Sequence, residues 1–270
     1  MSPGPLGPFG RVLVGVDGSA ESDEAIRQAA ALAEGELTLL AVYDTFPAVV
    51  AGPDALPRLD EDAQRRAAEE ALARAGDVPG SGPLPGKAVC GDACEELCRE
   101  CEREQVTLLA VGSHGAGRMR GIVLGSTATC VVHQAPCSVL VAREAGEGFP
   151  RSIVVGIDGS PESAAAYVAA RRLSERHNAE LLAVVAHGGK AVDERLADAI
   201  APGHATVGDD PAAALVAAAA DADLLVVGSR GLHGLRALGS VSERVAHEAS
   251  CSVLILRKPV WQRVAEELER

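Results

Sequence analysis

Three segments of this sequence occur twice, in the same order, and this internal repeat constrains the fold more than any other feature. Within each pair, the apolar residues, the glycines and the polar residues beside them match almost position by position. Self-similarity of this kind indicates two copies of one folding unit, and 270 residues are enough for two domains. The matching segments are residues 11–19 and 151–160, residues 108–115 and 224–231, and residues 133–140 and 247–254.

The two copies differ in length. Asp17 and Asp158 are 141 positions apart, whereas Gly112 and Gly228 are 116 positions apart, so the second copy is shorter by 25 residues in this interval. A short linker rich in Gly and Glu separates the copies. The expected parts are a first domain at residues 1–145, a second domain at residues 150–258 and a helical tail at residues 259–270.

Within each copy, short runs of β-branched residues and leucine alternate with stretches rich in Ala, Glu and Arg. The short runs are continuously apolar, which is typical of parallel strands buried on both faces. Strands that alternate with helices predict a doubly wound, Rossmann-like α/β sheet, because each right-handed crossover packs a helix on the sheet. In the first copy we expect strands at 12–16, 37–42, 87–89, 108–111 and 139–141, and helices at 22–33, 59–75, 93–104 and 126–134.

Charge and composition exclude several classes of function. The formal net charge is −13, and only 2% of the residues are aromatic. A nucleic-acid-binding protein needs cationic surface and, for single strands, aromatic platforms, and an anionic membrane surface also attracts basic proteins. The longest apolar run, residues 212–220, is much shorter than the roughly 20 residues of a membrane span. We therefore expect neither nucleic acid nor a membrane as a partner.

The cysteines bear on location and on redox chemistry. The chain has seven cysteines and no visible export signal, which favours reduced thiols and a cytoplasmic location. The spacing of Cys94, Cys98 and Cys101 places them on one helix face, where they would form a metal site, a redox sensor or a set of buried apolar thiols. We favour buried thiols, because the C-x-x-C pair lies in mid-helix rather than at a helix N-terminus.

The remaining polar clusters do not support catalysis. Cys130, His133 and Cys137 would give zinc only three ligands, and the second copy keeps only His247 and Cys251. No arrangement of Ser, His and an acid stands out, and no G-x-S-x-G elbow is present. We therefore expect no metal site and no hydrolase triad.

The ends of the first and fourth predicted strands carry the groups that suit a nucleotide. Asp17 ends the first strand, and a glycine-rich loop over residues 112–127 follows the fourth; open α/β sheets bind ligands at this edge. Glycines let backbone N–H groups converge on one anion, and the helix starting near Ser126 adds unpaired N–H groups. Arg118 and Arg120 lie either beside such phosphates or on a solvated loop face. An acceptor such as Asp17, set apart from these donors, suits adenine or ribose.

This loop is neither a Walker A sequence nor a G-x-G-x-x-G turn. The glycine spacing over residues 112–126 instead resembles the G-x2-G-x9-G-[S/T] signature of the ATP-binding universal stress proteins. The run VGVDGS at residues 14–19 and the run APCSVLV at residues 135–141 are also similar to that family. The resemblance covers nearly the whole chain and both copies.

The resemblance implies a five-stranded parallel sheet of order 3-2-1-4-5 in each domain, with ATP, and optionally Mg²⁺, between strands 1 and 4. Asp17 and the backbone of Val42 would contact adenine, and the glycine loop would hold ribose and phosphates. The site residues implied for the first domain are Gly15, Asp17, Val42, Val111, Gly112, His114, Gly115, Gly125, Ser126 and Thr127.

The second copy departs from this pattern. Gly228 and Gly231 are kept, but Gly239 and Ser240 follow after seven residues instead of nine. Two missing residues shorten the loop by about 7 Å, which is more than the size of a phosphate group. We therefore expect ATP in the first domain, and in the second only a weaker candidate site at Asp158, Gly228, Gly231, Gly239 and Ser240.

The resemblance also bears on assembly, because the last strand of a unit in this family often pairs across a dimer. Residues 138–142 and 252–256 would then pair within one chain and form an internal pseudo-dimer. An exposed edge strand also invites a second copy of the chain, which would give a homodimer.

Together these features predict a cytoplasmic tandem universal stress protein that binds ATP in its first domain and acts as a nucleotide-responsive regulatory module in the stress response. It would be no enzyme, or at most a slow ATPase, because no catalytic base or carboxylate pair for Mg²⁺ is evident. Two alternatives remain: a scaffold that binds no nucleotide and dimerises through its edge strands, and a thiol-based redox sensor with a bond among Cys94, Cys98 and Cys101.

Overall fold

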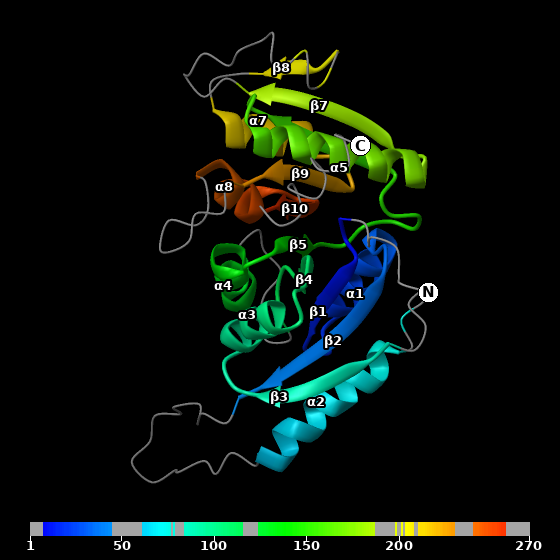
Figure 1. Cartoon of the computed structure of the whole chain (residues 1–270), viewed down its shortest axis with the longest axis vertical. Coiled ribbons are helices and arrows are strands. Elements are labelled where there is room, and N and C mark those ends of the chain that lie inside the picture. Colours follow the sequence, from blue (N-terminus) through cyan, green and yellow to red (C-terminus); the bar gives the residue numbers. More distant parts are fainter. Residues whose placement is uncertain are drawn as a thin grey trace.

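The part of the chain that the structure describes folds around one sheet of ten strands (Figure 1). The structure is a computed structural model. It describes residues 8–44, 61–76, 78, 84–115, 124–186, 198, 201, 203–207, 210–229 and 240–257.

The first domain alternates strands and helices as the sequence predicts. Its strands lie in the order β3-β2-β1-β4-β5, and all neighbours are parallel. The expected order 3-2-1-4-5 is therefore confirmed. The elements are β1 (Arg11–Val16), α1 (Ala20–Leu32), β2 (Glu36–Tyr43), α2 (Glu61–Ala75), β3 (Gly86–Cys90), α3 (Ala93–Arg103), β4 (Leu108–Gly112), α4 (Ser126–Gln134) and β5 (Ser138–Ala142).

The second domain repeats this arrangement in fewer residues. Its strands lie in the order β8-β7-β6-β9-β10, again with parallel neighbours. The described elements are β6 (Ser152–Ile157), α5 (Pro161–His177), β7 (Glu180–Ala186), β8 (Ala205–Val207), α7 (Pro211–Ala218), β9 (Leu224–Gly228), α8 (Ser240–Glu248) and β10 (Ser252–Leu256). The helical tail predicted at 259–270 lies outside the described residues.

The two domains meet through their last strands, β5 and β10, which pair antiparallel. Leu140 lies opposite Leu254, and both side chains are fully buried. The predicted pairing of these strands within one chain is therefore present. Whether the outer edges, at β3 and β8, pair with a second copy stays a prediction.

Helices cover both faces of the sheet, which explains why the strands are apolar along their whole length. One layer of the core packs α1, α2 and α5 against the sheet. The other layer packs α3, α4, α7 and α8 against the opposite face. Within the described residues, none of the helices is both long enough and apolar enough to cross a bilayer.

An arginine from the second domain reaches into the first at the junction. Arg257, which follows β10, is only 4% exposed. Its backbone N–H donates to Ser138 Oγ at 3.0 Å, and its guanidinium donates to the carbonyl oxygens of Val132 and Ala135 at the end of α4. Burial lowers the pKa of this guanidinium below its usual value.

Arg143, which follows β5, makes the reciprocal contacts with the second domain. Its backbone N–H donates to Ser252 Oγ at 3.0 Å, and its guanidinium donates to the carbonyl oxygens of Ala246 and Cys251 at 2.5 and 3.1 Å. Each arginine thus donates hydrogen bonds to carbonyl oxygens near the end of a helix in the other domain. Together the two arginines stabilise the contact between the domains.

Asp223, which directly precedes β9, accepts hydrogen bonds from Arg151, which directly precedes β6. This contact is expected to make the free energy of unfolding depend on pH. The Asp223 carboxylate accepts from the backbone N–H of Arg151 at 2.7 Å and from its guanidinium at 3.2 Å. Burial alone would raise the pKa of Asp223, but these hydrogen bonds outweigh it and leave the pKa below its usual value.

We predict that Asp223→Ala lowers the free energy of unfolding by about 2 kcal/mol at pH 7, as for hydrogen bonds to a charged group. A depressed folded pKa contributes stability above the unfolded value of about 4, and this contribution disappears as the pH falls through the folded pKa. Urea unfolding of both proteins at pH 7 and at pH 3 should therefore show the difference shrinking in acid. An equal difference at both pH values would refute the charged interaction.

Candidate functional site

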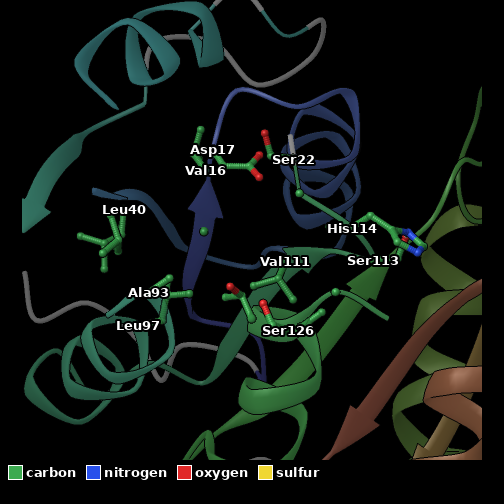
Figure 2. Close-up of a pocket in the computed structure, with 17 residues that line it drawn as sticks. Val16, Asp17, Ser22, Leu40, Ala93, Leu97, Val111, Ser113, His114 and Ser126 are labelled. Carbon is green, nitrogen blue, oxygen red and sulfur yellow. The ribbon is translucent and has the colours of Figure 1, made fainter. Parts of the chain in front are cut away.

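A cavity of about 330 Å³ lies at the carboxyl ends of β1 and β4, where the winding of the first domain reverses (Figure 2). This is the position at which open α/β sheets bind ligands. The structure brings together on its wall all ten residues that the sequence indicates for the first domain, while their contact with ATP stays a prediction. They are Gly15, Asp17, Val42, Val111, Gly112, His114, Gly115, Gly125, Ser126 and Thr127.

Seven further residues line the cavity and were not predicted. Three of them, Val16, Ser113 and Ala128, are direct sequence neighbours of predicted residues, whereas Leu40, Ala93 and Leu97 lie outside the signature segments. The only sequence feature that marked Leu40, Ala93 and Leu97 was the apolar face of β2 and of α3. The additional lining residues are Val16, Ser22, Leu40, Ala93, Leu97, Ser113 and Ala128.

One end of the cavity is apolar with an acid beside it. Leu40 and Leu97 are buried in the wall, and a methyl group on Gly15 would lie 3.2 Å from the Leu97 side chain. The absence of a side chain at Gly15 therefore lets Leu97 pack directly on β1 at this end of the cavity.

Asp17 is held in place at the end of β1 by the turn that starts α1. Its Oδ1 accepts from the backbone N–H and the hydroxyl of Ser19 at 3.0 and 2.5 Å. Gly18 adopts φ +75°, a conformation that favours glycine. The other oxygen, Oδ2, points towards Gly115, where an added methyl group would lie 2.6 Å from it. The carboxylate is therefore a fixed acceptor at the cavity edge.

The opposite end is formed by the start of α4, which has no side-chain cap. In the described helices α1, α3, α5 and α7, a Ser or Asp side chain caps the N-terminus. The N-cap of α4 is Gly125, which supplies no side-chain cap. The first N–H groups of α4, beside the hydroxyls of Ser126 and Thr127, therefore suit an anion from outside the chain.

Two predicted residues act differently from what the sequence suggests. The N–H of Gly125 already donates to the carbonyl of Ser113 at 2.8 Å, so this glycine ties the loop ends together instead of offering a free donor. The ring of His114 turns away from Asp17 and Ser126 in Figure 2, and its Nδ1 lies 3.1 Å from Ser113 Oγ. Residues 116–123, with Arg118 and Arg120, lie outside the described part.

The second domain has an equivalent of Asp17, whereas most of its glycine loop lies outside the described residues. Asp158 Oδ1 accepts from the backbone N–H and hydroxyl of Ser160 at 3.0 and 2.5 Å, as Asp17 does from its serine. Gly228 ends β9, and Ser240 begins α8. Gly231 and Gly239 lie outside the described residues, so the site predicted here is only partly visible.

The prediction that every thiol is free is wrong. Cys94 on α3 and Cys130 on α4 form a disulfide, with their Cα atoms 6.0 Å apart. A bond confined to the three clustered cysteines of α3 is therefore also wrong. The reason is tertiary: α3 and α4 lie side by side on one face of the sheet, and a separation of 36 residues gives no sequence signal for that contact.

The remaining described cysteines form no disulfide in the structure. Burial raises the pKa of Cys98 to about 11. A hydrogen bond with Cys137, together with burial, raises the pKa of Cys101. Of the three cysteines predicted to be buried thiols, Cys101 is a buried thiol, Cys98 is a half-buried thiol, and Cys94 is buried but in the disulfide. Among the described residues, no group of three or more His, Cys, Asp or Glu could hold a metal ion.

The fold and the cavity define a class: a tandem α/β protein whose two doubly wound domains share one sheet and whose first domain has a ligand-sized cavity at its switch point. The chain belongs to the universal stress protein family, whose family model matches residues 8–143 and 189–257.

Known relatives match nearly the whole chain. A universal stress protein of Mycolicibacterium smegmatis is 31% identical over 287 residues, which cover 91% of this chain and 96% of that protein. One of Mycobacterium tuberculosis is 31% identical over 297 residues, covering 92% and 97%. A crystal structure of a universal stress protein from Archaeoglobus fulgidus has a TM-score of 0.69 at 22% identity and covers 91% of this chain and 98% of its own. The last likeness concerns the fold alone.

Proposed function

We propose that the first domain binds ATP in this cavity and that the protein acts as a nucleotide-responsive regulatory module of the stress response in the cytoplasm. The observation that carries the proposal is that all ten residues implied by the family resemblance line one cavity of about 330 Å³. Small-molecule sites generally range from about 300 to 1,000 Å³.

The adenine would occupy the apolar end, against Leu40, Val42 and Leu97. Its faces are apolar, while its amino group and the ribose hydroxyls donate hydrogen bonds. The carboxylate of Asp17, fixed by Ser19, supplies the acceptor for one of them. The cavity wall thus offers both an acceptor and an apolar surface, as a nucleoside requires.

The phosphates would bind at the start of α4. Its uncapped N–H groups and the positive end of its dipole favour a polyanion. The hydroxyls of Ser126 and Thr127 add donors. When Mg²⁺ accompanies ATP, it would neutralise part of the phosphate charge there, and these two hydroxyls are the groups that would face it.

A regulatory role fits the wall better than rapid hydrolysis does. Asp17 is the one carboxylate on the described wall, and it stands at the end of β1 rather than at the start of α4. The other described lining residue that could act as a general base is His114, and its ring turns away from Ser126 in Figure 2. Any ATPase activity should be slow.

Isothermal titration calorimetry with ATP tests the proposal, using Asp17→Ala and Asp158→Ala as a matched pair. Both carboxylates accept the same two hydrogen bonds from the serine two positions further along the chain. Both variants therefore lose the same local contacts. We expect micromolar binding by the wild type, about −8 kcal/mol, and at least tenfold weaker binding by Asp17→Ala, since hydrogen bonds to a charged group contribute about 1.5–3 kcal/mol. Asp158→Ala should bind like the wild type, and Gly125→Glu should not bind.

The absence of both heat and co-purified nucleotide in the wild type would disprove the proposal. A stable oligomer by light scattering would then favour the scaffold without a ligand. Equal weakening by Asp17→Ala and Asp158→Ala would mean that the turn geometry, and not the acid at the cavity, matters.

A further inference from the structure

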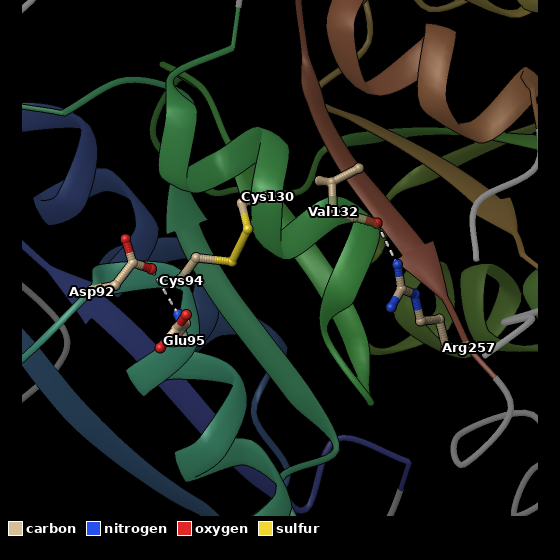
Figure 3. Close-up of a disulfide and its surroundings, with 6 residues drawn as sticks. All are labelled: Asp92, Cys94, Glu95, Cys130, Val132 and Arg257. Atoms are coloured by element: carbon tan, nitrogen blue, oxygen red, sulfur yellow. Dashed lines mark hydrogen bonds between the residues drawn. A yellow bond between two sulfur atoms is a disulfide. The ribbon is translucent and has the colours of Figure 1, made fainter. Parts of the chain in front are cut away.

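The disulfide between Cys94 and Cys130 (Figure 3) joins two helices that both contribute residues to the cavity wall. Cys94 follows Ala93, and one helical turn later Leu97 also lines the cavity. Cys130 is the fifth residue of α4, whose first three residues line the opposite end. The bond thus connects the helix of the apolar end to the helix of the anion end.

We propose that this disulfide is a redox control of the cavity: the oxidised form holds the walls in the geometry that accepts a nucleotide, and reduction weakens nucleotide binding. The proposal rests on the proposed function and adds a regulation to the same site. A cavity that is already formed binds more tightly than one that must be ordered on binding.

Other contacts anchor the far ends of these two helices, whereas nearer the cavity the disulfide links one helix directly to the other. The last turn of α4 is held by Arg257, which donates to Val132 and Ala135 (Figure 3). The last turn of α3 is held to β3 by an ion pair between Lys87 and Glu100 at 2.7 Å. Without the bond, the α4 N-terminus therefore loses its covalent link to α3.

The second domain supplies an internal comparison. Asp92 caps α3 and Asp210 caps α7, which aligns Cys94 with Ala212. The matching histidines, His133 and His247, align Cys130 with Arg244. The cysteine pair thus occurs only in the copy whose glycine loop has the full spacing, as expected of a device that serves that site.

The chemistry is thiol–disulfide exchange with a dithiol reductant. Cys94 is 5% exposed, whereas Cys130 is half-buried, so a thiolate of the reductant attacks Sγ of Cys130 and releases Cys94 as a thiolate, which takes up a proton. The second thiol of the reductant then attacks the mixed disulfide and frees Cys130. Two electrons and two protons pass to the protein, and the reductant leaves as a disulfide. A disulfide acceptor reverses the sequence.

The test compares ATP binding by oxidised and dithiothreitol-reduced protein, after a non-reducing digest and mass spectrometry have located the Cys94–Cys130 bond. We expect reduction to weaken binding about tenfold. Cys130→Ser should bind like the reduced wild type under both conditions. Cys98→Ser is the matched control on the same face of α3 and should respond to reduction as the wild type does.

Equal affinity of the oxidised and reduced forms would overturn the proposal, as would the absence of the Cys94–Cys130 peptide after mild oxidation. If neither form binds ATP, the proposed function fails. The rate of hydrogen–deuterium exchange over residues 124–130 in the oxidised and reduced proteins then tests the redox control of the cavity by itself. Faster exchange on reduction supports control of the cavity by the bond, and unchanged exchange refutes it.

Discussion

Replacing Arg257 with alanine is expected to lower the free energy of unfolding by about 3 kcal/mol, in the range found when one partner of a buried charged interaction is removed. The guanidinium is buried and donates to the carbonyl oxygens of Val132 and Ala135. Alanine leaves these helix-end carbonyls unpaired in a dry junction, and it also leaves a cavity. The effect should include looser docking of the second domain on α4.

Urea unfolding followed by circular dichroism measures this effect, with Arg244→Ala as control. Arg244 pairs with Asp210 on the surface, where ion pairs contribute little, so its removal should leave stability nearly unchanged. Arg143→Ala removes the reciprocal contacts and should resemble Arg257→Ala. If Arg257→Ala proves as stable as Arg244→Ala, the junction does not depend on this arginine.

The fold was predictable because each strand can be recognised from the pattern of its own residues. Continuous apolar runs predict strands covered on both faces, and each helix in the first domain falls within two residues of its expected start. The small shifts have local causes: α1 begins at Ala20 rather than at residue 22 because Ser19 caps it, accepting from the backbone N–H of Ser22. The contacts of Arg143 and Arg257 were not predicted, because the repeated segments end at residues 140 and 254, three positions before each arginine.

The site was predictable where glycines and the acid mark the ends of strands, and not where it depends on packing between helices. Gly115 and Asp17 both lie on the cavity wall, and Gly115 lies against the Asp17 carboxylate. The wall residue Leu97 and the bond between Cys94 and Cys130 both depend on how α3 lies on the sheet beside α4. No local pattern encodes that contact.

Two glycines of the signature, Gly112 and Gly125, have different structural roles. Replacing each with alanine should therefore change stability to a different extent, and the change at Gly112 is the second large effect. We predict that Gly112→Ala lowers the free energy of unfolding by about 3 kcal/mol, as for overpacking against backbone that cannot give way. A methyl group there would lie 2.8 Å from the backbone carbonyl carbon of Glu21 and 2.9 Å from its oxygen. At Gly125, the nearest atoms would be 3.5 Å away, an ordinary contact, so Gly125→Ala should change stability by less than about 0.5 kcal/mol.

Gly228→Ala supplies the decisive comparison, because Gly228 occupies the same place in the second domain. Its methyl group would lie 2.5 Å from the carbonyl oxygen of Glu162, so this variant should lose at least as much stability as Gly112→Ala in the same urea titration. The second copy keeps this glycine although its loop has lost the spacing for phosphates, as expected if the glycine lets α1 or α5 pack against the strand end. Stable Gly112→Ala and Gly228→Ala proteins would show instead that these helices shift to accommodate a side chain.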